Sequence, residues 1–240
     1  METSLGSIIS GFSALLNSGL ETISRSVSVK PELSRNSILS VIDPFAASIM
    51  ESVAKISNNG CFYRGEICYK NLGCFNTGQS ASKLTCFLPE LPSFIRTRFH
   101  LYTRPEGPGV PISYDEEDFL DAVPRGGRLV IIVHGYTENG GESDYQEMMR
   151  RLLRFTDTDA VVVVNGGVAL RIGNFLRAIA NTELVGRQVA LLIEKLRIHR
   201  AIDGKNVHLV GFSLGTKVSH FACSWGSQLF GTRIGRVTGE

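Results

Sequence analysis

The sequence has neither a long apolar run nor an excess of charge of one sign. No apolar stretch in the 240 residues reaches the about 18 residues that a membrane span needs, so we expect no transmembrane segment. The 25 basic residues nearly balance the 23 acidic ones, and Lys and Arg form no run. This balance gives no reason to expect binding to nucleic acid or to a strongly anionic membrane. The length and the 43% hydrophobic content predict one globular core of ordinary size.

The sequence also lacks a cysteine pair at zinc-site spacing. Four of its five cysteines, Cys61, Cys68, Cys74 and Cys86, are spread over one stretch, whereas zinc ligands usually come as close C-x-x-C pairs, so we expect no metal site. Clustered cysteines in a loop-rich segment indicate two disulfides and a secretory history. Reduced thiols are the alternative, and three pairings are possible. Cys223 lies on an expected helix and is interpreted as a buried free thiol.

An ordinary signal peptide is missing as well, although disulfides would require secretion. The first residues contain Glu2, no basic cluster, and an apolar run that Ser and Gly interrupt, so either the signal is atypical or the true start differs from Met1. Residues 1–60 show apolar residues at helical spacing on both sides of Pro31, which predicts two amphipathic helices in a leader or extension. We interpret them as packed on the body or loose; a lipid-surface or partner-docking segment is the alternative.

Strands and helices alternate from about residue 94 onward. Strands are expected at Thr97–Thr103, Arg128–Gly135, Ala160–Gly167, Lys205–Gly211 and Thr232–Gly239. Helices are expected at Glu142–Phe155, Asn181–His199 and Leu214–Trp225. This alternation predicts an α/β fold with a mostly parallel sheet and helices on both faces. Ligands of such sheets bind at the carboxyl ends of the strands, where Ser213, the turn at His134 and Gly135, and Gly239 are expected.

One short motif within this pattern points to chemistry. Gly211-Phe212-Ser213-Leu214-Gly215 follows an expected strand and opens an expected helix, which is the context of a nucleophile elbow. The chain reverses so sharply there that Gly211 and Gly215 must lack side chains, while the turn lifts the Ser213 hydroxyl clear of the sheet. The helix N-terminus would direct its free N–H groups at a developing oxyanion. Ser213 is therefore the candidate nucleophile, and a turn without chemistry is the alternative.

An oxyanion hole needs two donors, and the sequence offers a candidate for each. One is the N–H of Leu214, directly after the nucleophile, and the other is the N–H of Tyr136, in the loop after the expected strand that ends at His134 and Gly135. We interpret His134 as a structural histidine at a strand end. As a general base it precedes the serine in the chain, which is the wrong order for this arrangement.

The motifs together resemble the pancreatic-type lipase family of α/β-hydrolases, the animal neutral lipases and phospholipases A1. The resemblance runs from about Cys68 to Gly239 and leaves residues 1–60 outside it. Six segments carry it: ICYKNLGCF, TRFHLYTR, VHGYTENG, IANTELVGRQVALLIEKL, NVHLVGFSLGTKVSHFA and RIGRVTG. On this basis residues 61–240 are expected to form the N-terminal part of a lipase α/β-hydrolase domain.

The resemblance implies a secreted, extracellular hydrolase of lipid carboxylic esters, either a triacylglycerol lipase or a phospholipase A1, acting at a lipid–water interface. Ser213 matches the family nucleophile, and Tyr136 and Leu214 match the oxyanion positions. Cys68 and Cys74 match a family disulfide, which leaves Cys61 and Cys86 for a second one. No metal and no organic cofactor is implied.

The chain departs from the family pattern at three places. Asn165 and Gly166 stand where the family usually has Val-Asp-Trp, and Phe212 stands where it usually has His. The family acid follows a Thr-Gly pair, whereas this chain ends at Glu240 directly after that pair. His220 lies two helical turns beyond Ser213, about 10 Å away, too far for proton transfer.

We therefore expect a lipase-type enzyme whose natural chain continues past Glu240, with the fold incomplete at its C-terminus here. The alternatives are a non-catalytic lipid-binding relative and an inactive truncated product. Substrate choice among acyl lipids is not predicted, because the family's lid lies in the part of the fold that this sequence does not contain.

Overall fold

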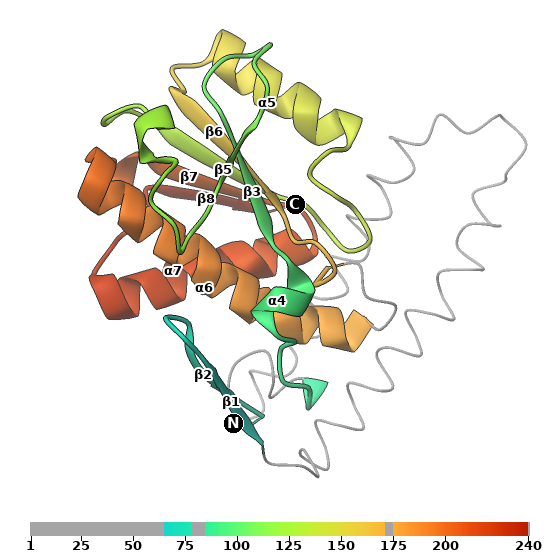
Figure 1. Cartoon of the computed structure of the whole chain (residues 1–240). Coiled ribbons are helices and arrows are strands. Elements are labelled where there is room, and N and C mark those ends of the chain that lie inside the picture. Colours follow the sequence, from blue (N-terminus) through green and yellow to red (C-terminus); the bar gives the residue numbers. More distant parts are fainter. Residues whose placement is uncertain (1–64, 78–84, 171–174, 240) are drawn as a thin grey trace, which may run out of the picture. The chain divides into compact units, whose positions relative to one another are not determined.

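The computed structural model describes residues 65–77, 85–170 and 175–239. These residues form a two-stranded hairpin and a six-stranded sheet with its helices (Figure 1). The strands are β1 Glu66–Tyr69, β2 Gly73–Asn76, β3 Arg98–Tyr102, β4 Val110–Ile112, β5 Leu129–Val133, β6 Ala160–Asn165, β7 Val207–Gly211 and β8 Arg236–Gly239. The helices are α4 Pro92–Ile95, α5 Ser143–Phe155, α6 Phe175–Arg200 and α7 Leu214–Phe230, with 3-10 turns η1 Leu120–Ala122 and η2 Gly204–Asn206.

The larger sheet is parallel across four of its strands and antiparallel at one edge. Its strand order is β4-β3-β6-β5-β7-β8, and β6, β5, β7 and β8 run parallel to one another. β3 pairs antiparallel with both β4 and β6. The predicted α/β class with a mostly parallel sheet is confirmed. The alternation of strands and helices did not predict this antiparallel edge. No helix lies between β3 and β4, and the direction of β3 is known only from its pairing with β4 and β6.

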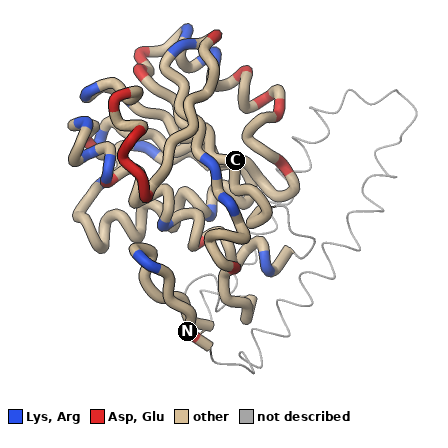
Figure 2. Tube along the Cα trace, in the orientation of Figure 1, with Lys and Arg blue, Asp and Glu red and all other residues tan. Residues whose placement is uncertain are grey.

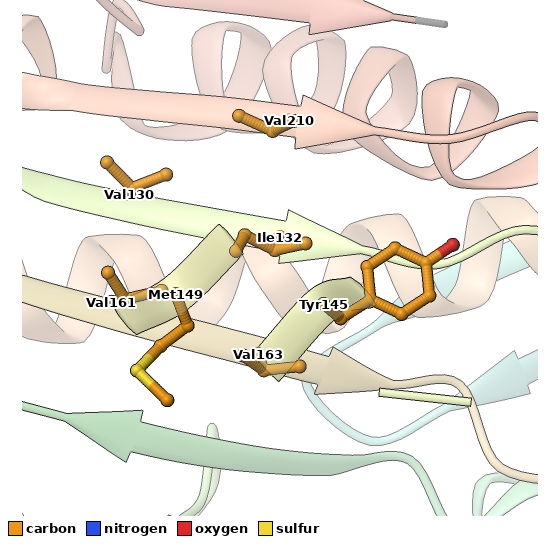
Figure 3. Packing of buried hydrophobic residues seen from close by; sticks show 7 residues of the cluster. All are labelled: Val130, Ile132, Tyr145, Met149, Val161, Val163 and Val210. Carbon is orange, nitrogen blue, oxygen red and sulfur yellow. The ribbon is translucent and has the colours of Figure 1, made fainter. Parts of the chain in front are cut away.

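The two central strands form the core because every face they present is covered. All five residues of β5 are buried, as are the first five of β6, and neither strand carries a charge, whereas charged residues gather on outer helices and loops (Figure 2). Continuous Val and Ile runs of this kind are typical of strands buried on both faces. On the face under α5, seven residues pack together (Figure 3): Val130, Ile132, Tyr145, Met149, Val161, Val163 and Val210.

The opposite face of the sheet is covered by α6 and α7, which lie side by side (Figure 1). Their close approach depends on a small residue in α6. A Cβ added at Gly186 would lie 2.6 Å from the Phe221 Cβ and 2.8 Å from the Val218 carbonyl oxygen of α7. Because contacts under 3.0 Å do not occur between such atoms, only glycine fits there at this helix separation.

The hairpin of β1 and β2 is closed by a disulfide and fastened to α6 by one arginine. Cys68 and Cys74 are directly opposite each other and bonded, as the family resemblance implies. The Arg187 guanidinium lies 3.9 Å from the centre of the Phe75 ring and donates a 2.6 Å hydrogen bond to the Leu72 carbonyl oxygen. The same guanidinium therefore satisfies a backbone acceptor and covers an aromatic face, two roles for which its planar shape is suited.

The second expected disulfide is only half within the described residues. Cys86 is disulfide-bonded, but its expected partner Cys61 lies outside them, so this pairing stays a prediction. Cys223 is a free thiol, as expected, although it is half-buried. The expected helices within residues 1–60 also lie outside the described residues, and the division of the chain at residue 60 stays a prediction.

Most predicted elements are present with shifted bounds. α6 begins at Phe175, not at Asn181, and α7 continues to Phe230, not Trp225, while only the last four residues of Thr232–Gly239 form a strand. The hairpin, α4 and β4 were not predicted, because each is built from elements of four residues or fewer and shows no periodicity. Across the described ranges the structure has no helix with the length and apolarity to cross a membrane.

Alanine substitutions at two helical glycines test the contact between α6 and α7. We expect Gly186→Ala to lower the free energy of unfolding by about 1–3 kcal/mol, since the added methyl group collides with α7. Gly226→Ala is the matched control: its nearest contact would be Ala190 Cβ at 3.7 Å, so it should raise stability by up to about 1 kcal/mol. Urea unfolding measures both, and equal effects at the two glycines would contradict the described packing.

Candidate active site

Ser213 occupies the strained turn that a nucleophile elbow requires. It follows β7, precedes the first residue of α7, and has φ +48° and ψ −113°, a backbone conformation that residues with a side chain rarely adopt. A Cβ at Gly211 would lie 2.4 Å from the Gly215 carbonyl oxygen, and one at Gly215 would lie 2.2 Å from the Val133 carbonyl oxygen. The two glycines therefore let the helix start pass directly over the ends of β7 and β5, as the motif predicts, and Ser213 is exposed.

The loop after β5 lies beside the elbow. A Cβ at Gly135 would lie 3.1 Å from the Ser213 Cβ, and the Phe212 N–H donates a 3.0 Å hydrogen bond to the Val133 carbonyl oxygen. The Thr137 N–H donates a 2.8 Å bond to the Leu170 carbonyl oxygen on the far side of the loop. The structure thus brings together Ser213 and the segment that carries the candidate oxyanion donor, as the sequence predicts.

The two candidate oxyanion donors belong to the two segments that meet at the serine. Leu214 is the first residue of α7, where helix geometry leaves the N–H without an intrahelical partner. Tyr136 directly follows Gly135 in the adjoining loop, and its ring meets the Phe175 ring edge-on at a centroid distance of 4.9 Å. The catalytic roles of Ser213, Tyr136 and Leu214 stay predictions.

His134 is a structural histidine, in agreement with the preferred interpretation of the sequence. It is 1% exposed; its Nδ1 lies 2.8 Å from the Gly135 carbonyl oxygen, and its Nε2 accepts a 2.9 Å bond from the Gly166 N–H. These partners fix a neutral ring with the proton on Nδ1. Burial lowers the pKa of His134 below its usual value. Both ring nitrogens are occupied, so His134 does not serve as the base for Ser213.

The other four histidines of the sequence all lie among the described residues, and none of them is placed to act on Ser213. His220 is exposed two turns into α7, about 10 Å along the helix axis from the serine. The remaining three lie on β3, at the end of α6 and near the start of β7, away from the carboxyl ends of the parallel strands: His100, His199 and His208. A base for Ser213 is therefore not among the five histidines.

Comparisons with known proteins agree with this geometry. A sequence model of the lipase family matches residues 65–240. The chain belongs to the lipase family. Pancreatic triacylglycerol lipase of Mus musculus is 33% identical over 181 residues, covering 72% of this chain and 37% of that protein. The Homo sapiens protein of the same name is 32% identical over 181 residues with the same shares, and pancreatic lipase-related protein 2 of Myocastor coypus is 31% identical over 186 residues, again 72% and 37%.

This lipase-family chain spans less than two fifths of the length of those relatives. The resemblance to pancreatic-type lipases and the α/β fold are thereby confirmed. Among the described residues, the only group with potential metal-ligand spacing is Glu66, Cys68 and Cys74, and both sulfurs are bonded to each other.

Two departures from the usual family sequence have a structural basis. A Cβ at Gly166 would lie 2.7 Å from two atoms of the Leu170 side chain, so Leu170 fills the space next to the backbone where a larger residue would begin. Asn165 accepts a 3.0 Å hydrogen bond from the Gly167 N–H and so shapes the turn after β6. Phe212 packs edge-on against the Tyr145 ring at 5.3 Å between centroids. Each change is matched by a neighbour and leaves the elbow intact.

Two side chains in the site were not found from the sequence. Glu138 accepts a 2.7 Å hydrogen bond from the Gly135 N–H and a second bond from the Tyr145 hydroxyl. Burial, together with Glu138, raises the pKa of Tyr145, so this hydroxyl keeps its proton and donates it. A glutamate in a polar loop is usually a solvated charge, and only its place three residues after Gly135 could have drawn attention to it.

The strain at Ser213 predicts that the protein becomes more stable when this side chain is removed. We expect Ser213→Gly to raise the free energy of unfolding by about 1 kcal/mol, because glycine adopts φ +48° without steric cost. Ser227→Gly, at an exposed position of the same helix, should lower it by about 0.5 kcal/mol. Thermal and urea unfolding of both variants provide the test. A loss of stability in both would contradict a strained elbow.

The buried neutral His134 makes stability depend on pH. Its folded-state pKa lies below the unfolded value, so its contribution is complete above about pH 6.5 and is lost as the pH falls toward the folded pKa. We expect wild-type stability to fall as the pH drops below about 6.5, and this fall to be shallower in His134→Gln by up to about 1.4 kcal/mol per pH unit. His100 and His208, whose pKa values burial also lowers, remain in both proteins and cancel in the comparison. Parallel pH profiles would refute this role.

Proposed function

We propose that the natural protein hydrolyses carboxylic esters of acyl lipids through a serine acyl-enzyme, as a triacylglycerol lipase or a phospholipase A1. The observation that carries this proposal is the strained, exposed Ser213 beside the loop of Gly135 and Tyr136 in a chain of the lipase family. An exposed serine in a strained turn at a helix N-terminus is costly for stability, and such strain is concentrated at functional sites.

The mechanism assigns one step to each part of the site. The Ser213 hydroxyl oxygen attacks the ester carbonyl carbon while its proton passes to a histidine base, and the negative charge that forms on the carbonyl oxygen is stabilised by the Leu214 and Tyr136 N–H groups. Collapse of this intermediate expels the alcohol with that proton and leaves the acyl group on the serine. Water then attacks the acyl-enzyme and releases the fatty acid.

None of the five histidines supplies the base that this mechanism needs. A serine hydroxyl without an adjacent base is a weak nucleophile. Turnover by the proposed route therefore requires a histidine, and an acid to orient it, in addition to the groups described here. The oxyanion donors alone would leave only a small residue of the rate.

A lipid–water interface as the place of action is supported by exposed apolar residues near the site. Leu91, Phe94 and Val168 are 54%, 49% and 39% exposed; Leu91 directly precedes α4, Phe94 lies on it, and Val168 lies in the loop after β6. That loop leads to Leu170, whose carbonyl oxygen holds the Thr137 N–H of the candidate oxyanion loop. Exposed apolar side chains on a loop that is hydrogen-bonded to the candidate oxyanion loop favour a substrate with acyl chains. The disulfide of the hairpin supports an extracellular, secreted protein, since such bonds persist in oxidising compartments.

A second candidate function is lipid binding without turnover. It would need no base beside Ser213, and none of the five histidines of the given sequence reaches that serine. The two candidates differ in a direct measurement. A natural protein that retains fatty acid or phospholipid in a binding assay, yet releases no acid from tributyrin or phosphatidylcholine vesicles, would favour the non-catalytic function.

Replacing the candidate nucleophile tests the enzymatic proposal. We expect Ser213→Ala in the natural protein to lower the hydrolysis rate on tributyrin or phosphatidylcholine by at least about 1,000-fold, because no acyl-enzyme forms. Ser227→Ala, an exposed serine of the same helix, should leave the rate unchanged. Turnover that survives Ser213→Ala would refute the proposed nucleophile.

A further inference from the structure

One carboxylate connects the candidate oxyanion loop to α5, the helix that packs against the elbow. The Glu138 Oε2 accepts both the Gly135 N–H, at 2.7 Å, and the Tyr145 hydroxyl of α5. Gly135 is buried and Glu138 is half-buried, so the bond to the backbone is only partly in contact with water. A hydrogen bond to an ionised acceptor is about twice as strong as one between neutral groups. We name the three groups, Glu138, Gly135 N–H and Tyr145 hydroxyl, the carboxylate clasp.

The clasp also reaches the elbow. The Tyr145 ring that donates to Glu138 packs edge-on against the ring of Phe212, the residue before Ser213. Tyr145 belongs to the cluster under α5 and is 6% exposed, so its position is set by the core (Figure 3). The loop that carries Tyr136 is thus tied through Glu138 to a core residue that itself contacts the elbow.

The direction of the Tyr136 N–H depends on the peptide groups around Gly135. The carbonyl oxygen of Gly135 accepts from His134 Nδ1 at 2.8 Å, and because a peptide group is planar and trans, this bond fixes the opposite direction of the Tyr136 N–H. The preceding peptide group is fixed by Glu138, which holds the Gly135 N–H. Loss of the carboxylate frees the peptide plane before Gly135 and so weakens the restraint on the direction of the proposed donor.

We propose that Glu138 is a positioning residue that holds the oxyanion loop against the elbow, so that the Tyr136 N–H is already aimed at the ester oxygen before the reaction begins. This inference rests on the proposed function. Prearranged donors of this kind act mainly on the transition state, where the charge develops. A change at Glu138 should therefore lower kcat and kcat/KM together and leave KM nearly unchanged.

Steady-state kinetics of the natural protein on a soluble short-chain ester test this assignment. We expect Glu138→Ala to lower kcat by about 10-fold or more with KM within about twofold of wild type. Glu138→Gln, which keeps a weaker neutral acceptor, should be intermediate, and Tyr145→Phe, which keeps the ring on Phe212, should lose less. The double variant Glu138→Ala with Tyr145→Phe should be no slower than Glu138→Ala alone, because the hydroxyl acts through the same carboxylate.

The matched control is Glu147→Ala, an exposed glutamate of α5 that pairs with Arg150 and Arg151 on the surface. Its kcat should equal that of wild type. All rates are measured well below the melting temperature of each variant, so a purely structural carboxylate would lower that temperature without changing kcat.

The outcomes separate the two proposals. An unchanged kcat in Glu138→Ala, together with an inactive Ser213→Ala protein, overturns the clasp and leaves the proposed function standing. A KM that rises while kcat stays constant also overturns it, because it would place Glu138 in substrate binding. A wild-type protein without turnover overturns the proposed function, and the inference falls with it.

Discussion

The site depends on the close approach of α7 to the carboxyl end of β5. A Cβ at Gly215 would lie only 2.2 Å from the Val133 carbonyl oxygen, which also accepts a hydrogen bond from the Phe212 N–H. At this spacing Ser213 has a strained backbone conformation with positive φ, and the N-terminus of α7 lies beside the loop of Gly135. A single methyl group at residue 215 would push the start of α7 away from the end of β5 and so disrupt the turn that holds Ser213. The buried Val and Ile runs of β5 and β6 supply the rigid base on which this contact is built.

The sequence predicts the elbow and the loop because each rests on a local rule. Glycines on both sides of Ser213, after an apolar strand and before an amphipathic helix, are typical of a sharp strand-to-helix turn. The disulfide of Cys68 and Cys74 follows from the resemblance to the family rather than from the spacing, which leaves three pairings open. The antiparallel direction of β3 was not predicted, since periodicity gives the burial of a strand and not its direction. Glu138 was not predicted either, because its partners come from the fold and not from its neighbours in sequence.

The departures from the usual family sequence change only local packing and leave the shape of the elbow intact. Phe212 extends the apolar cluster under α5 through Tyr145, and Leu170 occupies the space beside Gly166. His134, at the end of β5, accepts the Gly166 N–H from the turn after β6, so one hydrogen bond joins the two strand ends beside the elbow. Under the proposed function, Ser213 and the adjoining loop supply the nucleophile and the oxyanion donors of an ester hydrolase. The proton transfer that this chemistry also requires is not provided by any of the five histidines of the sequence.

The central claim is that Ser213 reacts as a nucleophile at the proposed site, and covalent trapping tests it most directly. The natural protein is treated with a p-nitrophenyl alkylphosphonate, whose phosphorus mimics the tetrahedral ester intermediate, and its peptides are analysed by mass spectrometry. The account predicts one phosphonyl group per protein, carried by the peptide that contains Ser213, with release of one equivalent of p-nitrophenol. A protein that stays unmodified, or that carries the group on another residue, would contradict it.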